Sequence, residues 1–199
     1  HDSPFQISKI VGEFYGNYYW MRHKLPFVKA RFQNVYGPRE ILGAGSWRGT
    51  AHSVWRNVTP TFVWRSLHGE ALQLDNGGNA SRDFIYVGDI VEGLIACATK
   101  GEPSEAYNLA SGVDTTILDM ANLINEITGN ETPHDLKPAR NWDRSGKRFG
   151  SVEKSKDKLG FVAKTDLRNG IQHTVDWTRE NKLMIKERML KYLKYLPEL

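Results

Sequence analysis

The sequence predicts a mixed α/β fold, because helical and strand-like patterns alternate along its 199 residues. Apolar residues near the N-terminus recur at helical spacing, and the segment from Phe27 to Phe32 carries the β-branched and aromatic residues typical of a strand. Further helices and short strands alternate downstream. The length fits one domain with a single core, or one domain with an appendage.

A long helix is expected to begin at Ser3-Pro4-Phe5-Gln6. Ser3 can cap the helix, Pro4 suits its first turn, and Gln6 stands three residues after the cap. Phe5 and Lys9 are four residues apart, so the helix would place them on one face, one turn apart. The apolar face of this helix would comprise Ile7, Ile10, Val11, Phe14, Tyr15 and Tyr18.

The strand at Phe27 to Phe32 is expected to end at Asn34, before the break Tyr36-Gly37-Pro38. Residues 39 to 56 are rich in Gly, Arg and Trp without clear periodicity, which predicts a long loop. Long structured loops in compact domains are commonly functional.

The remaining elements follow from the same patterns. A polar loop is expected from Pro133 to Gly150. The predicted strands lie near residues 71–74, 84–87 and 106–109. The predicted helices lie near residues 59–67, 89–99, 116–127 (stopped by Gly129), 167–180 and 182–196.

The charge and composition are those of an ordinary globular protein. A net charge of +4 raises the possibility of a nucleic-acid partner. Much of the excess, however, comes from Lys154 to Lys158 and Lys182 to Lys194, where basic and apolar residues mix as on solvated helix faces. We therefore expect no nucleic-acid partner. Since no apolar run approaches the length of a membrane span, we expect no membrane association either.

The single cysteine, Cys97, lies in an apolar run, which predicts a buried and inert thiol. One cysteine excludes a disulfide within the chain and favours a reducing compartment. His1 is not an initiator methionine, and the opening residues lack the layout of a signal peptide. We therefore expect the N-terminus to be a truncation.

The segment Phe5-Gln6-Ile7-Ser8-Lys9 resembles the Tyr-x-x-x-Lys signature of the short-chain dehydrogenases, with Phe5 at the tyrosine position. In that family the tyrosine is the acid/base for hydride transfer, and the lysine lowers its pKa and holds the nicotinamide ribose. A phenol with a pKa near 10 needs such a cation to act at neutral pH. Taken alone, the pattern also fits an aromatic core residue near a surface lysine.

An ordered series of segments extends this resemblance to the nucleotide-sugar epimerase and dehydratase branch of the extended short-chain dehydrogenases. The series covers nearly the whole chain and comprises Arg31 to Pro38, Ser81 to Ile90, Tyr107 to Gly112 and Leu159 to Phe161. The resemblance implies the C-terminal part of a Rossmann-type doubly wound fold plus a smaller mixed α/β substrate-binding domain. Residues 1–38 would end the Rossmann-type domain, and residues 39–199 would mainly form the substrate domain, with some segments returning to the first sheet.

The resemblance also implies which residues bind the substrate. Asn34 and Arg82 would contact the sugar diphosphate, and Asn57 would contact the substrate just before a helix. Arg140 resembles the later phosphate-binding arginine of the branch, although the surrounding spacing makes Arg148 an alternative. Arginine suits this role because its guanidinium binds phosphate in a bidentate manner.

Each of these residues also has an ordinary structural interpretation. Arg82 could form an ion pair with Asp83, Asn34 could cap a turn, and Asn57 could cap the helix that follows it. For Arg82 and Asn34, the prediction that they bind substrate depends on the wider resemblance. For Asn57, substrate binding and helix capping explain the sequence equally well.

Two departures from the family pattern limit the expected activity. The glycine-rich dinucleotide loop and the upstream Ser/Thr partner of the tyrosine do not occur in the sequence. Phe5, Lys9 and Phe32 would border the nicotinamide if that missing half were present. Phe5 has no hydroxyl, so it can neither donate nor accept the proton, whether it is natural or was introduced to trap a substrate.

The resemblance implies that the intact protein is an NAD-dependent, 4-epimerase-like enzyme acting on a nucleotide-diphosphate sugar through a keto-sugar, with a UDP-sugar favoured. It further implies a cytoplasmic homodimer, formed through the helix that begins at Phe5 and its neighbour, that serves surface-polysaccharide precursor synthesis. One alternative is a catalytically inactive sugar-nucleotide-binding protein, and another is a basic nucleic-acid-binding module.

Overall fold

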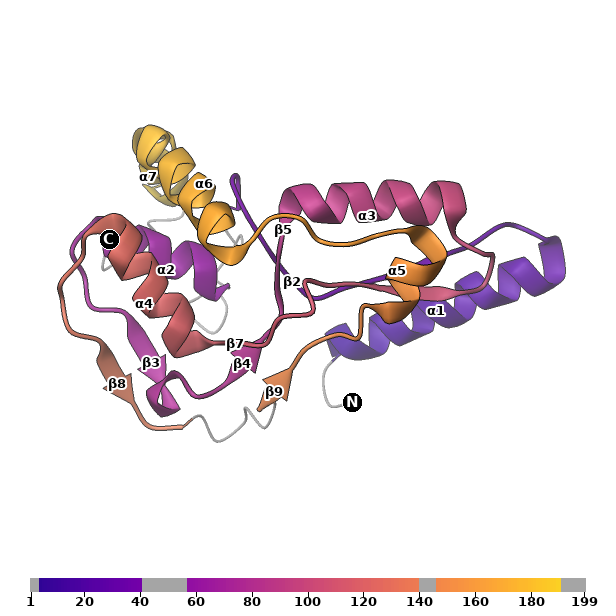
Figure 1. The fold of residues 1–199 in the computed structure, drawn as a ribbon, viewed down its shortest axis with the longest axis horizontal. Coiled ribbons are helices and arrows are strands. Elements are labelled where there is room, and N and C mark those ends of the chain that lie inside the picture. Colours follow the sequence, from indigo (N-terminus) through magenta and orange to yellow (C-terminus); the bar gives the residue numbers. More distant parts are fainter. Residues whose placement is uncertain (1–3, 41–56, 140–145, 191–199) are drawn as a thin grey trace.

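The computed structural model describes residues 4–40, 57–139 and 146–190 and confirms the α/β class (Figure 1). The helices are α1 (Pro4–His23), α2 (Val58–Leu67), α3 (Val87–Lys100), α4 (Ile117–Thr128), α5 (Glu153–Leu159), α6 (Leu167–Glu180) and α7 (Lys182–Leu190), with a short 3-10 turn at Asn76–Gly78. The strands are β1 (Lys29–Phe32), β2 (Asn34–Tyr36), β3 (Gln73–Asp75), β4 (Ser81–Arg82), β5 (Phe84–Tyr86), β6 (Ala106–Leu109), β7 (Thr115–Thr116), β8 (Asp135–Lys137) and β9 (Lys147–Arg148).

The strands form small sheets in which parallel pairing dominates. β1 pairs with β6, β2 with β5 and β3 with β8, all in parallel. β4 lies between β7, which is antiparallel to it, and β9, which is parallel. Because β1 and β2 are separated only by Gln33, the chain changes its pairing partner from β6 to β5 at that point.

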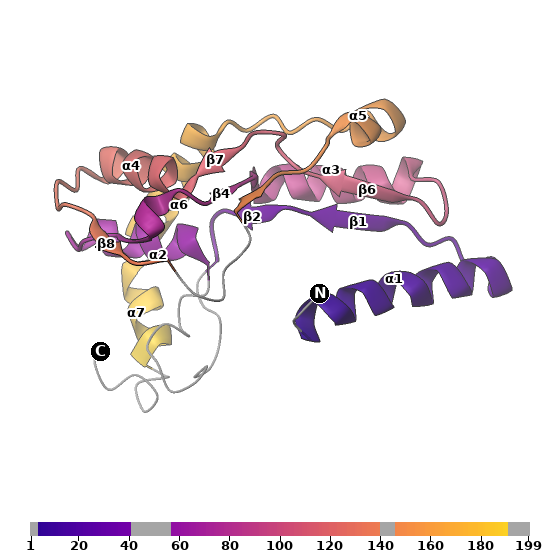
Figure 2. The same ribbon diagram turned by 90° about the horizontal axis from the view of Figure 1, so that it is seen from below.

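One hydrophobic cluster of the described residues lies around the β1–β6 pair. Helix α3 covers one face of this pair, and α1 runs along the other face (Figure 2). The buried members of the cluster are Ile85, Ile90, Cys97, Tyr107, Leu109, Leu159 and Phe161. Cys97 is therefore buried as expected, and burial raises the pKa of its thiol, which disfavours the reactive thiolate.

The second cluster lies among α2, α4 and α6, at the other end of the molecule (Figure 1). Its buried members are Tyr36, Phe62, Val63, Leu72, Leu74, Phe84, Met120, Ala121, Ile124, Ile171 and Val175. Tyr36 and Phe84 come from β2 and β5, so these two strands join the two ends of the molecule.

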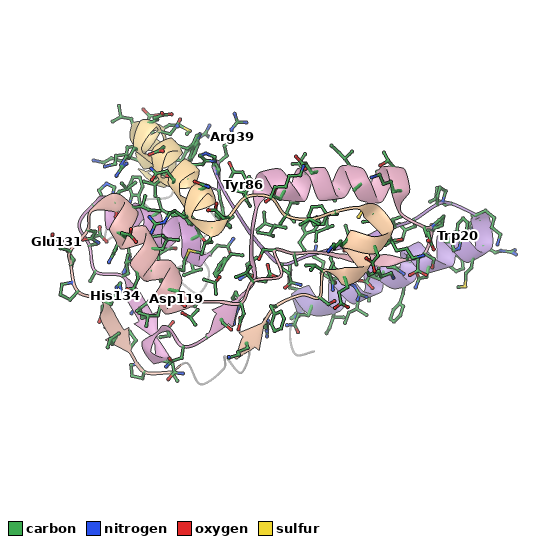
Figure 3. All side chains as sticks on the ribbon, in the orientation of Figure 1. Trp20, Arg39, Tyr86, Asp119, Glu131 and His134 are labelled. Atoms are coloured by element: carbon green, nitrogen blue, oxygen red, sulfur yellow. The ribbon has the colours of Figure 1, made fainter. Side chains whose placement is uncertain are left out.

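Helix α4 shows how local signals define an element. At its N-terminus, Thr116 Oγ1 accepts a hydrogen bond from the N–H of Asp119 at 2.9 Å. Figure 3 labels Asp119 on this helix. At its C-terminus, Gly129 adopts a φ of 76°, a left-handed conformation that glycine tolerates without strain. The helix predicted to stop at Gly129 is therefore confirmed.

Several predictions need correction. The strand predicted to run to Asn34 is two strands, β1 and β2. The predicted polar loop at 133–150 contains β8 and β9, and the strands β4 and β7 were not predicted. These segments are two or three residues long, so their own sequences carry little strand signal. The loop predicted within 39–56 and the last helical residues toward 196 lie largely outside the described residues.

No helix in the described ranges is long and apolar enough to cross a membrane.

Candidate functional site

Helix α1 runs antiparallel to β1 and is held there by polar contacts (Figure 2). Lys29 Nζ donates to Asn17 Oδ1 at 2.7 Å, and Arg31 donates to both carboxylate oxygens of Glu13, at 2.8 and 2.6 Å. Four residues of a helix span about 6 Å, and two residues of a strand span about 6.6 Å. Four residues along α1 therefore cover nearly the same distance as two residues along β1. The next turn of the helix therefore brings Lys9 to the carboxyl end of β1.

Phe5 and Lys9 share a face of α1, as their spacing predicts. The Nζ atom of Lys9 lies 5.2 Å from the centroid of the Phe5 ring. The ring is 70% exposed, and its attraction to the ammonium group is worth about 0.5–1 kcal/mol at such a site. The lysine is thus in position to act on a group at residue 5, but phenylalanine supplies no exchangeable proton.

The carboxyl end of β1 presents two further predicted site residues, Phe32 and Asn34. Both side chains are exposed. The backbone N–H of Asn34 donates to the carbonyl oxygen of Asp83 at 2.9 Å, which fixes the start of β2 beside β5. In sheets of this kind ligands bind outside the carboxyl ends of parallel strands, where these side chains lie.

Arg82 and Arg148 are direct partners in the parallel pairing of β4 with β9. Arg82 Nη1 donates to the carbonyl oxygens of Ser81 and Gly146, at 2.7 and 2.8 Å, which holds the guanidinium beside the strand. Partner residues on adjacent strands project from the same face. Like charges placed opposite each other repel, so an anion bound at this face would relieve that repulsion.

The backbone of Asp83 connects these arginines to Asn34. Its N–H donates to the carbonyl oxygen of Arg148 at 3.0 Å, and its carbonyl oxygen accepts from Asn34. Asn34, Arg82 and Arg148 therefore come from three strands that meet at one residue, although 114 positions separate the first from the last along the chain. Sequence reasoning placed Asn34 and Arg82 in one site with Arg148 as an alternative to Arg140, and the backbone of Asp83 connects these three residues.

The other two predicted substrate residues are not brought to this meeting point by the contacts described. Arg140 lies outside the described residues. Asn57 occupies the N-cap position of α2, yet its side chain makes no capping bond; its Nδ2 donates instead to Glu40 Oε1. Burial raises the pKa of the Glu40 carboxyl, and the hydrogen bond from Asn57 partly opposes that shift.

Asp83 itself is a residue that sequence reasoning considered only as an ion-pair partner. Its side chain is 1% exposed, and its carboxylate accepts hydrogen bonds from Ser111 and Gly112. The signal was available, because both partners belong to a segment, Tyr107 to Gly112, that carries the family resemblance. Within the described ranges, no group of three or more His, Cys, Asp or Glu side chains is arranged to hold a metal ion.

The sequence matches the model of the NAD dependent epimerase/dehydratase family over residues 1–110. It is 29% identical to the dTDP-D-glucose 4,6-dehydratase of Mus musculus over 184 residues, which cover 90% of this chain and 48% of that protein. It is 30% identical to a putative UDP-glucose 4-epimerase of Methanocaldococcus jannaschii, covering 90% of this chain and 54% of the relative. The chain thus spans about half the length of the curated relatives it matches.

Solved structures give the same result at the level of the fold. The enzyme WbmF of Bordetella bronchiseptica, solved with NAD+ and UDP, is 57% identical with a TM-score of 0.87, over 96% of this chain and 57% of WbmF. A UDP-glucose 4-epimerase of Thermotoga maritima, solved with UDP-glucose, is 31% identical with a TM-score of 0.81, over 90% of this chain and 54% of that enzyme.

Proposed function

The chain belongs to the NAD-dependent epimerase/dehydratase family, and we propose that the intact protein converts a nucleotide-diphosphate sugar through a transient keto-sugar in a 4-epimerase-like reaction. The observation that carries this proposal is the pairing of Arg82 with Arg148 beside Asn34. Two guanidinium groups on one face match the charge and the oxygen-rich shape of a diphosphate.

A uridine diphosphate sugar is the favoured substrate. Two of the similar structures support this choice, since WbmF was solved with UDP and the Thermotoga maritima epimerase with UDP-glucose. In our proposal Arg82 and Arg148 hold the phosphates and Asn34 donates or accepts a hydrogen bond at the sugar side. Asn57 and Arg140 remain proposed substrate ligands on the strength of the motif resemblance.

NAD is the cofactor of the family, and Phe5, Lys9 and Phe32 are the residues of this chain proposed to border its nicotinamide. The support for that role is that Phe5 and Lys9 share one face of α1, which runs along β1, and that the exposed rings of Phe5 and Phe32 offer apolar surface to a flat ring. When bound, NAD supplies the hydride acceptor for sugar oxidation. Lys9 would hold the ribose through its ammonium group.

Phe5 favours a second candidate function. Oxidising a sugar hydroxyl breaks one C–H and one O–H bond; the hydride passes to NAD+ and the proton must pass to a base. Phenylalanine cannot accept that proton. A catalytically inactive protein that binds a sugar nucleotide, descended from such an enzyme, would retain the arginine pair and lack turnover.

The two candidates are separated by an experiment on the full-length protein. It is incubated with NAD and a panel of UDP-, dTDP- and GDP-sugars, with residue 5 as Phe and as Tyr (Phe5→Tyr), and products are followed by NMR. Turnover with Phe at residue 5 establishes an enzyme that uses another base. Turnover only with Tyr shows that the site is built for the reaction and that Phe5 disables it. Binding without turnover in both forms supports the inactive binding protein, and absence of sugar-nucleotide binding contradicts both candidates.

Three further properties complete the proposal. Residues 1–38 end a Rossmann-type domain, and residues 39–199 mainly form the substrate domain. The protein forms a homodimer through α1, which is supported by the exposure of Phe14, Tyr15 and Tyr18. It acts in the cytoplasm in the synthesis of surface-polysaccharide precursors.

A further inference from the structure

Asp83 is a buried residue whose carboxylate accepts hydrogen bonds from the Ser111–Gly112 turn. Oδ1 accepts from the N–H of Ser111 at 2.8 Å and from its hydroxyl at 2.7 Å, and Oδ2 accepts from the N–H of Gly112 at 2.8 Å. Both oxygens are therefore engaged, at a side chain that is 1% exposed. A group so placed is expensive to bury unless every one of these bonds is kept.

The turn that Asp83 holds has little freedom of its own. Gly112 adopts a φ of 78°, a left-handed conformation, and an added Cβ would approach Val152 to 3.3 Å. Ser111 Oγ also accepts from the N–H of Val113 at 3.2 Å, just before β7. The carboxylate thus fixes the connection between β6 and β7, and β7 pairs with β4, the strand of Arg82.

The backbone of the same residue joins the strands that carry the proposed phosphate ligands. Its N–H donates to Arg148 O in β9, its carbonyl oxygen accepts from Asn34 N in β2, and Arg82 precedes it in the chain. A shift of Asp83 would therefore move three ligand residues relative to one another. Bidentate contacts to phosphate depend on such relative placement, to within a fraction of an ångström.

We propose that Asp83 is a positioning residue of the diphosphate site: its carboxylate, anchored on the Ser111–Gly112 turn, sets the relative placement of Arg82, Arg148 and Asn34. This inference rests on the proposed function, because it assumes that these residues bind the diphosphate. It assigns to Asp83 no contact with substrate.

The test compares two buried aspartates in the full-length protein. Asp83→Asn presents an NH2 group to one of two backbone N–H donors, so one bond is lost in either orientation. Asp89→Asn is the matched control, because Asp89 is 4% exposed and its carboxylate likewise accepts two backbone N–H bonds, from Lys164 and Thr165, at the start of α3. Calorimetry gives the Kd for UDP and for NAD, and circular dichroism reports folding.

We expect Asp83→Asn to weaken UDP binding at least tenfold while the Kd for NAD stays within twofold, and Asp89→Asn to leave both within twofold. UDP binding unchanged in folded Asp83→Asn, or weakened equally by both variants, would overturn the inference. If Asp83→Asn does not fold, Ser111→Ala is measured instead, because it removes one of the three hydrogen bonds to the Asp83 carboxylate. A threefold or greater loss of UDP affinity in Ser111→Ala supports the positioning role of Asp83, and no loss overturns it. Arg82→Ala tests the underlying function separately, because unchanged UDP binding in that variant refutes the diphosphate site itself.

Discussion

Helices α6 and α1 both carry apolar residues at helical spacing, yet the fold covers only one of them. In α6, Ile171 and Val175 are fully buried against α2, α4 and β5. In α1, Phe14 and Tyr15 remain about two-thirds exposed, and only Gly16 is buried, against the ring of Phe27. Figure 2 shows α1 lying along the outside of the β1–β6 pair.

This difference shows what an amphipathic pattern can and cannot predict. The pattern indicates that a face is suited to being covered, because exposed apolar surface is unfavourable in water. It does not say what covers the face. For α6 the cover comes from the same chain, whereas for α1 the proposed cover is a second copy of the protein.

The largest expected effect is in α6. Ile171→Ala removes a fully buried side chain and leaves a cavity, so we expect a loss of about 2–5 kcal/mol in the free energy of unfolding, measured by urea denaturation. Leu183→Ala in α7 is the control, because that leucine is 80% exposed and its truncation should cost less than about 0.5 kcal/mol. Equal losses in the two variants would show that burial does not distinguish these positions.

A smaller effect is expected where α1 is attached to β1. Glu13→Gln removes the charge that pairs with Arg31, and partly exposed pairs of this kind contribute about 0.2–1 kcal/mol. The hydrogen bond and charge of Arg31 lower the pKa of Glu13. The stabilisation is therefore present above the ordinary carboxyl pKa of about 4.5 and disappears as the pH falls through the lowered value. Unfolding free energies of both forms, measured from pH 7 down to pH ~3, should converge at low pH; a constant difference would contradict this account.

The smallest effect on the stability of residues 1–199 is expected on the outer face of α1. Phe14→Ser should change the free energy of unfolding by less than about 0.5 kcal/mol, because its ring is largely exposed. In the full-length protein the same change should weaken self-association, seen by light scattering coupled to size-exclusion chromatography. A stability loss as large as that of Ile171→Ala would mean that this chain covers the α1 face itself.

Local sequence signals predicted those parts of the fold whose boundaries depend on neighbouring residues. The strand at Ala106–Leu109, the helix at Leu167–Glu180 and the helix end at Gly129 are confirmed at the expected positions. β4 and β9 were missed because a two-residue strand exists only through its partner. For β4 one partner strand, β9, lies 66 residues away at Lys147 and Arg148, and the other, β7, lies more than 30 residues away at Thr115 and Thr116.

In the candidate site, too, contacts between residues close in the sequence could be predicted, whereas contacts between distant segments could not. Phe5 and Lys9 are joined by one helical turn, so their contact followed from spacing. The choice between Arg140 and Arg148 could not be made from spacing, and both stay proposed phosphate ligands. The structure pairs Arg148 with Arg82 in adjacent strands, and Arg140 lies outside the described residues. The anchoring of Asp83 on Ser111 and Gly112 likewise joins segments about 28 residues apart.

The central claim is that Arg82 and Arg148 form a diphosphate site, and the most direct measurement is the Kd for UDP of the full-length Arg148→Ala variant beside Lys147→Ala. The two residues are adjacent in β9, so their side chains project from opposite faces. A charged hydrogen bond contributes about 1.5–3 kcal/mol, so we expect a loss of affinity of roughly tenfold to a hundredfold for Arg148→Ala and less than about twofold for Lys147→Ala. Equal effects in the two variants, or none in Arg148→Ala, would contradict the proposed site.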